Sequence, residues 1–206
     1  TSLIGIYKIS KGDKNVVALN INSVEYSVKN PSLSSDGKSI YFSSDMPGGY
    51  GNFDIYKGDI DEKGNINNVE NLGQKVNTEG QEMFPFIGDK NNLYFSSDSQ
   101  LGLGGLDVFF TKEVDGKWAS VRNVGIPVNS NADDFAFNIN EATGEGFVSS
   151  NRSGGKGSDD IYSIKRLIPI CDVLLTANVM DAKTKLGIDS ATTSISDKEG
   201  NIASTK

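Results

Sequence analysis

One pattern occurs three times in the chain, each copy beginning 53 residues after the last. The copies read YFSSDMPGGYGNFDIY from Tyr41, YFSSDSQLGLGGLDVF from Tyr94 and FVSSNRSGGKGSDDIY from Phe147. Each has β-prone ends around a loop rich in Gly and Asp. Because similarity at a fixed period is the sequence signature of a repeat architecture, we interpret the loop as a corner of a repeated unit and not as a ligand site.

Three kinds of position recur within the loop. An Asp or Asn opens it, two Gly fill it, and an Asp closes it before an apolar pair. Gly permits positive φ in turns, and Asp accepts hydrogen bonds from backbone N–H groups at strand ends. We therefore predict a structural role for this repeat motif, which comprises Asp45, Gly49, Gly51, Asp54, Asp98, Gly102, Gly104, Asp107, Asn151, Gly155, Gly157 and Asp160.

The segments around the loop predict four short strands per unit. Upstream, two strands are joined by a turn that reads DGK, DKNN or ATGEG in the three copies. Downstream, residues 65–73 (NINNVENLG) align with residues 117–125 (KWASVRNVG) and predict a fourth strand. Because a lone four-stranded meander leaves one apolar face in water, such units stack on one another. The predicted fold is all-β, a β-propeller of four-stranded blades.

The predicted domain boundaries lie where the repeat begins and breaks. Repeats are expected near 31–83, 84–135 and 136–166, with a partial blade over 1–20 in which Tyr7 takes the place of Tyr56. The pattern ends at Arg166. Residues 167–206 predict the first strands of a small β-sandwich, with turns at AKTKLG and at residues 197–201. Since a closed ring has four to eight blades, we expect a partial ring, either because further blades precede it in a longer polypeptide or because the piece is held open.

Composition narrows the chemistry. The 206 residues carry a formal net charge of −7, which argues against nucleic-acid binding. The absence of His removes the usual general base and metal ligand, and the lone Cys171 cannot form an internal disulfide. No apolar run approaches the roughly 20 residues of a membrane-spanning helix. We therefore expect no catalysis, cofactor, bound metal or membrane span.

Other motifs also favour structural roles. Asp45 with Asp54 offers too few oxygens for calcium, and residues 59–64 (DIDEKG) lack the third and twelfth ligands of an EF-hand loop. The spacing in SSDGK does not fit a sialidase Asp-box, and GLGG is not followed by the Lys-Ser/Thr of a phosphate loop. Trp118 aligns with Ile66, which predicts packing in the core or at a blade edge, and Cys171 is expected to be a buried apolar residue.

Two alternatives from other functional classes remain open. A glycan-binding propeller would need exposed aromatics on one rim, for which Tyr50 and Phe53 are candidates, although the other copies do not repeat them. A propeller hydrolase would need a pair of Asp side chains at glycosidase spacing, because a Ser-His-Asp set cannot form without His. Nothing in the sequence selects such a pair.

The pattern PSLSSDGKSIYFSSD…GGYGNFDIY resembles the WD40-like PD40 repeat of TolB-type propellers. It is most similar to the version in PorE-like, OmpA-family envelope proteins of Bacteroidetes that are associated with type IX secretion. The later segment VMDAKTKLGIDSATTSISDKEGN resembles the start of a carboxypeptidase-regulatory-like domain, which follows the propeller in that family.

This resemblance implies a periplasmic scaffold at the outer membrane that positions envelope or secretion-system proteins. It also implies that peptidoglycan is bound through an OmpA-like domain absent from this sequence.

Overall fold

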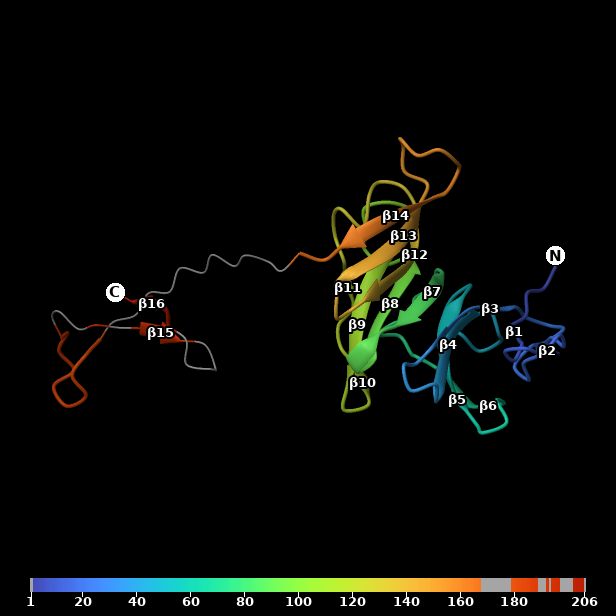
Figure 1. Cartoon of the computed structure of the whole chain (residues 1–206), viewed down its shortest axis with the longest axis horizontal. Coiled ribbons are helices and arrows are strands. Elements are labelled where there is room, and N and C mark those ends of the chain that lie inside the picture. Colours follow the sequence, from blue (N-terminus) through green and yellow to red (C-terminus); the bar gives the residue numbers. More distant parts are fainter. Residues whose placement is uncertain (1, 168–178, 189–191, 193, 197–201, 206) are drawn as a thin grey trace. The chain divides into compact units, whose positions relative to one another are not determined.

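Antiparallel sheets make up the structure of the protein, a computed structural model that describes residues 2–167, 179–188, 192, 194–196 and 202–205 (Figure 1). Contacts divide the chain into two units, Thr1–Leu167 and Ile168–Lys206. The predicted all-β class is confirmed. Among the described residues, the only helical element is the 3₁₀ turn η1 (Asp89–Asn91).

Three successive sheets follow the repeat. Sheet 1 has the order β3 (Val28–Leu33), β4 (Ser39–Ser44), β5 (Asp54–Ile60) and β6 (Ile66–Asn71). Sheet 2 has β7 (Glu82–Ile87), β8 (Asn92–Ser97) and β9 (Asp107–Val114), with β10 (Lys117–Trp118) and β11 (Arg122–Asn123) both paired to β9. Sheet 3 contains β12 (Asp134–Asn140), β13 (Glu145–Ser150) and β14 (Asp160–Lys165).

Two further strand pairs lie outside these sheets. Near the N-terminus, β1 (Tyr7–Lys8) pairs with β2 (Val17–Ala18). In the C-terminal unit, β15 (Ser194–Ser196) pairs with β16 (Ile202–Thr205). The predicted turn over residues 182–187 is present, since the Lys185 N–H donates to the Asp181 carbonyl. The predicted turn at residues 197–201 and Cys171 lie outside the described residues.

Equivalent residues occupy equivalent strands in the three sheets. Tyr41, Tyr94 and Phe147 all lie in the second strand of their sheets, as predicted. The preceding turns contain Gly37, Asn91 and Gly144, whose φ values of 68°, 59° and 73° are left-handed and suit Gly or Asn.

The predicted fourth strand over residues 117–125 differs from the observed structure. In sheet 1 the equivalent strand, β6, is continuous, but in sheet 2 it is divided into β10 and β11. Thr111 stands where sheet 1 has Gly58, and its hydroxyl donates to the Ala119 carbonyl at 2.9 Å between the two short strands. The Ala119 N–H donates to the Lys112 carbonyl at 2.9 Å, so one backbone and one side-chain hydrogen bond hold the segment between the two short strands.

Alternating side chains give each sheet one face toward the preceding sheet and one toward the following sheet. In β4, Phe42 packs toward the N-terminal strand pair, whereas Tyr41 packs toward sheet 2. In β8, Phe95 packs toward sheet 1 and Tyr94 toward sheet 3. The core of unit 1 therefore consists of the layers between successive sheets.

The outward face of sheet 3 is exposed. Tyr41 and Ile55, which cover the equivalent face of sheet 1, are 2% and 0% exposed. Phe147 and Ile161 hold the same register positions in sheet 3 and are 52% and 75% exposed. Two large apolar side chains therefore lie where the other sheets form an interface.

The first strand of every sheet bends at the same place. Asn30, Phe84 and Ala136 have φ values of 53°, 52° and 51°, and each lies at a register shift in its strand pair. Positive φ is uncommon for residues other than Gly, and such bulges increase strand twist. The bend is thus a constant feature of the repeat.

Candidate functional site

The closing Asp of each repeated loop binds the backbone of its own loop. Asp107 Oδ2 accepts hydrogen bonds from the N–H groups of Leu103 at 2.6 Å and Gly104 at 2.9 Å. Asp54 and Asp160 accept the same two bonds in their own loops, from residues 50 and 51 and from residues 156 and 157. These carboxylates hold the corner in shape.

The predicted reason for the loop glycines is wrong. None of the six motif glycines has a positive φ. A Cβ at Gly49, Gly102 or Gly155 would instead collide with a carboxylate oxygen of the closing Asp. At Gly51 and Gly104 a Cβ would collide with backbone carbonyls of the segment that leads to the next sheet. These five motif glycines therefore serve close approach, whereas the left-handed backbone of the first and third loops falls at Gly48 and Gly154, with φ values of 92° and 95°.

The opening residue of each loop holds the start of the first strand of its own sheet. Asp45, Asp98 and Asn151 accept hydrogen bonds from the backbone N–H groups of residues 27, 81 and 133, at 2.6, 2.8 and 2.8 Å. An Asn oxygen accepts this bond as an Asp oxygen does, which accounts for the change to Asn151 in the third copy.

Sequence reasoning missed a second repeated feature at Asn22, Asn77 and Asn129. We call each of these side chains, with the two backbone hydrogen bonds that it makes, an Asn clamp. The Asn77 side chain accepts from the Ile55 N–H at 2.8 Å and donates to the Ile55 carbonyl at 3.0 Å. Asn22 makes the same two bonds with Ile6, and Asn129 makes them with Val108.

Each clamp ties the segment before one sheet to the third strand of the sheet before it. The recurring sequence in which an apolar residue is followed by Asn and then Ser or Thr, at residues 21–23, 76–78 and 128–130, is the signal that could have found the clamp.

Glu82 is buried at the start of β7 and accepts hydrogen bonds from Thr78 and Ser97. Burial raises the pKa of this carboxyl above its ordinary value, and the hydrogen bonds oppose that rise. In sheet 3 the equivalent Asp134 accepts from Ser130 and pairs with Arg152. These acids anchor the first strands.

Within the part of the chain that the structure describes, no three acidic or Cys side chains gather in a way that could hold a metal ion. In the same part, no helix is long and apolar enough to cross a membrane.

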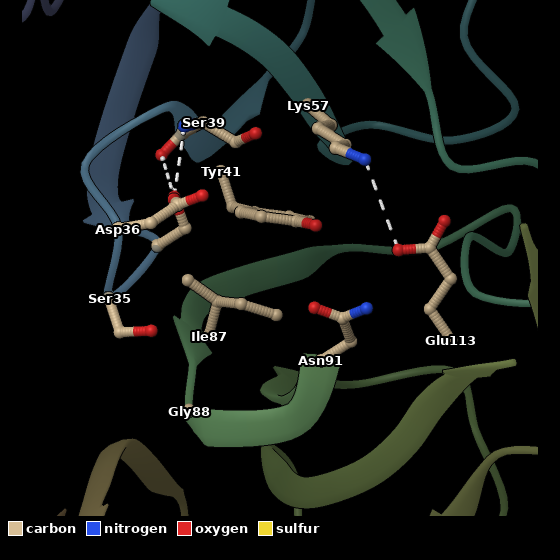
Figure 2. Close-up of a pocket in the computed structure, with 10 residues that line it drawn as sticks. Ser35, Asp36, Ser39, Tyr41, Lys57, Ile87, Gly88, Asn91 and Glu113 are labelled. Carbon is tan, nitrogen blue, oxygen red and sulfur yellow. Dashed lines mark hydrogen bonds and ion pairs between the residues drawn. The ribbon is translucent and has the colours of Figure 1, made fainter.

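A pocket of about 230 Å³ lies between sheets 1 and 2 (Figure 2). Ser39, Tyr41 and Lys57 line it from sheet 1, and Ile87, Asn91 and Glu113 line it from the second repeat, with Asp36 in the turn before β4. Lys57 Nζ and Glu113 Oε2 are 3.9 Å apart across the opening, so a weak ion pair joins the two sheets there. None of the pocket residues was identified as a site from the sequence.

Tyr41 supplies the only phenol in this pocket. Figure 2 shows its hydroxyl pointing into the space between Lys57, Asn91 and Glu113. The side chain is 2% exposed, and no described residue forms a hydrogen bond with the hydroxyl. Burial, with a smaller contribution from the Glu113 carboxylate, raises the pKa of Tyr41 far above its ordinary value. The phenol therefore stays protonated and can donate.

The corresponding position between sheets 2 and 3 is filled. There Glu141 Oε1 accepts a hydrogen bond from the Asn92 side chain at 2.7 Å and lies 3.5 Å from the Tyr94 hydroxyl. Tyr94 is the repeat equivalent of Tyr41. The pocket at Tyr41 is thus a departure from the repeat.

The other residues considered in the sequence analysis make packing contacts or turn hydrogen bonds, or are exposed. Trp118 packs at the edge of the layer between sheets 1 and 2, with its ring edge-on to Tyr41, which confirms the packing prediction. Lys29 Nζ lies 3.3 Å from the centre of the Phe53 ring and covers it, whereas Tyr50 is exposed. Asp61 accepts bonds from the N–H groups of Lys63 and Asn65, as in a charged hairpin turn.

Comparisons with known proteins identify no family for the chain. No family model matches the chain, and no curated protein matches it. Among solved structures, a Mycobacterium tuberculosis puromycin-hydrolyzing peptidase is similar, with 15% sequence identity and a TM-score of 0.48. The match covers 79% of this chain but only 26% of that one.

Proposed function

We propose that the chain is a non-catalytic interaction scaffold built from β-propeller blades. The observation that carries this proposal is the use of the repeated polar residues. The closing Asp, the opening Asp or Asn and the Asn clamp all hold backbone groups at the joints within and between sheets. Because the polar groups that recur between the copies are engaged in holding the backbone, they support a role in presenting a surface and not in catalysis.

The layered sheets support the propeller architecture. Each layer repeats the same face-to-face contact, and sheet 3 ends in the exposed face of Phe147 and Ile161. In a propeller the next blade covers such a face. The blade number of the whole ring is left open by this proposal.

The resemblance to PD40 repeats of envelope proteins supports the cellular role. In this proposal the scaffold lies in the periplasm at the outer membrane and positions envelope or type IX secretion proteins relative to peptidoglycan. Residues 167–206 would begin the carboxypeptidase-regulatory-like domain.

Affinity capture from a cell-envelope fraction, with chemical cross-linking and mass spectrometry, tests this role. We expect cross-links from lysines of residues 2–167 to envelope or secretion-system proteins, and no hydrolysis of peptide, ester or glycoside reporter substrates by the purified chain. Turnover of any of these substrates above background, lost on unfolding, would overturn the non-catalytic assignment. Cross-links confined to cytoplasmic contaminants would contradict the envelope role.

A further inference from the structure

The pocket between sheets 1 and 2 carries an inference that goes beyond the scaffold role and does not depend on it. Its walls come from strands β4, β5 and β9 and from η1, so the packing of two sheets fixes its shape (Figure 2). Sites formed where rigid elements meet are largely preformed, which lowers the entropic cost of binding.

The pocket retains hydrogen-bonding capacity that the fold does not use. The Tyr41 hydroxyl reaches the pocket without a hydrogen-bond partner among the described residues, and the Asn91 side chain lies across from it. A hydroxyl in this position can donate a hydrogen bond to a ligand that enters the pocket. The next layer illustrates this, because Glu141 takes the equivalent place beside Tyr94.

Charge and size restrict the ligand. Asp36 and Glu113 bring two carboxylates to the wall, against the single ammonium of Lys57, which disfavours an anion. Lys57 donates and Glu113 accepts, so a group that does both can bridge the 3.9 Å between them. A volume of about 230 Å³ is below the range of drug-sized sites, so one small ring fills it.

We propose that this pocket binds a small neutral polyhydroxyl compound of the size of one sugar ring. Its hydroxyls bond to Tyr41, Asn91, Lys57 and Glu113, and one face of the ring rests on Ile87.

Amide chemical shifts of the full chain, recorded during titration with glucose, galactose and gluconate, test the proposal. We expect at least one neutral sugar to shift amides near Gly88 and Asn91 with saturation, and gluconate, which has the same hydroxyl groups and a carboxylate, to bind more weakly. If neither neutral sugar shifts these amides, or if gluconate binds more tightly than both, the proposal fails.

Three variants locate the site. Tyr41→Phe removes one hydrogen bond and should weaken binding about two- to tenfold. Ser39→Leu places an apolar side chain in the pocket and should abolish binding. Tyr94→Phe removes the equivalent phenol from the next layer and should leave binding unchanged.

Thermal unfolding of each variant confirms that it folds, and amides remote from the pocket serve as the internal reference. Equal affinity in the wild type, Tyr41→Phe and Ser39→Leu would overturn the assignment, because the sugar would then bind elsewhere. If Ser39→Leu fails to fold, the comparison of Tyr41→Phe with Tyr94→Phe decides alone.

Discussion

At the scale of single residues, carboxylates in this protein replace missing backbone pairing. Asp54, Asp107 and Asp160 each gather two N–H groups that a tight corner leaves without a strand partner. The adjoining glycines bring the backbone close enough for these bonds. The Gly and Asp of the motif therefore depend on each other. A larger residue in place of the Gly would push the backbone away from the carboxylate, and without the Asp the close approach would serve no hydrogen bond.

Replacing Asp107 with Ala should lower the free energy of unfolding by roughly 1–3 kcal/mol, because the N–H groups of Leu103 and Gly104 lose their acceptor. Urea unfolding measures the change. The experiment is repeated with calcium and with a chelator, and we expect the same result in both. A calcium-dependent stabilisation of the wild type that Asp107→Ala loses would show that the loop is a metal site. No destabilisation at all would show that the Asp is dispensable for the fold.

Glu82 should give a measurable pH dependence. Its pKa in the folded protein is raised above the ordinary value of 4.5, so the folded state holds this proton at a pH where the unfolded chain has released it. The resulting stabilisation is complete below about the unfolded pKa and is lost as pH rises through the folded pKa.

Glu82→Gln removes this titration. The difference in unfolding free energy between the wild type and Glu82→Gln should therefore shift against the wild type as pH rises above 4.5. Denaturant unfolding from pH 4 to pH 8 measures it. A difference that is constant with pH would contradict the raised pKa.

At the scale of elements, the Asn clamp sets how consecutive sheets join. Each clamp satisfies both backbone groups of a third-strand residue that faces the next sheet. At the same joints, the N–H groups of Val28, Glu82 and Asp134 donate to the carbonyls of Ile4, Phe53 and Leu106. The layer between two sheets is thus aligned by polar bonds at its edge as well as by apolar packing.

Asn77→Ala should be strongly destabilising. It leaves the buried Ile55 N–H without a partner, which costs roughly 1–3 kcal/mol, and removes one of the two donors to the Ile55 carbonyl, which still accepts from the Leu72 N–H. Asn52→Ala provides the matched control, because Asn52 is exposed and its side chain makes no hydrogen bond with a described residue; it should change stability by less than about 0.5 kcal/mol. Urea unfolding measures both changes. Equal effects of the two substitutions would show that the Asn77 clamp does not stabilise the joint between the sheets.

At the scale of the whole molecule, unit 1 ends in two incomplete layers. Phe147 and Ile161 are exposed on the last face, and Tyr7 is exposed on the first strand pair. Exposed apolar sheet faces of this kind mark sites of association. Phe147 and Ile161 hold the register positions that form an interface in sheet 1, so we expect the face that they form to bind another sheet.

The isolated chain should therefore associate reversibly with copies of itself as its concentration rises. Sedimentation equilibrium measures the average mass. The double substitution of Lys for Phe147 and Ile161 should shift the equilibrium to the monomer, whereas Leu101→Lys, at an exposed loop position, should not. A wild type that stays monomeric at millimolar concentration would show that the exposed face does not bind another sheet.

The sequence was sufficient for the features that each repeat contains within itself. Turn residues such as Gly37 and Asn91, together with the 53-residue spacing, located the hairpins and put Tyr41, Tyr94 and Phe147 in equivalent strands. These features depend on local backbone preferences and on alternation, both of which can be recognised in a short window.

Features formed between repeats could not be predicted in this way. The Asn77 clamp joins residues 22 positions apart in different sheets, and the pocket at Tyr41 arises because the second repeat lacks a counterpart of Glu141 there. The close approach at Gly102 also needs coordinates, since Gly for space and Gly for positive φ look the same in a sequence. Comparison of the copies for differences, and not only for likeness, is what would have located the pocket.

Because the joints between successive sheets use the same hydrogen bonds, a repeat could be gained or lost during evolution without breaking a joint. Asn77 and Asn129 make the same two bonds to Ile55 and Val108, so the segment that begins at one clamp can follow either sheet. An in-frame loss of the codons for residues 77–128 would bring Asn129 next to Val76, with Ile55 available to receive it. Gain or loss of one repeat between two Asn clamps therefore leaves a junction that can form the same two hydrogen bonds. Proteins built from this repeat should differ in length by multiples of about one repeat.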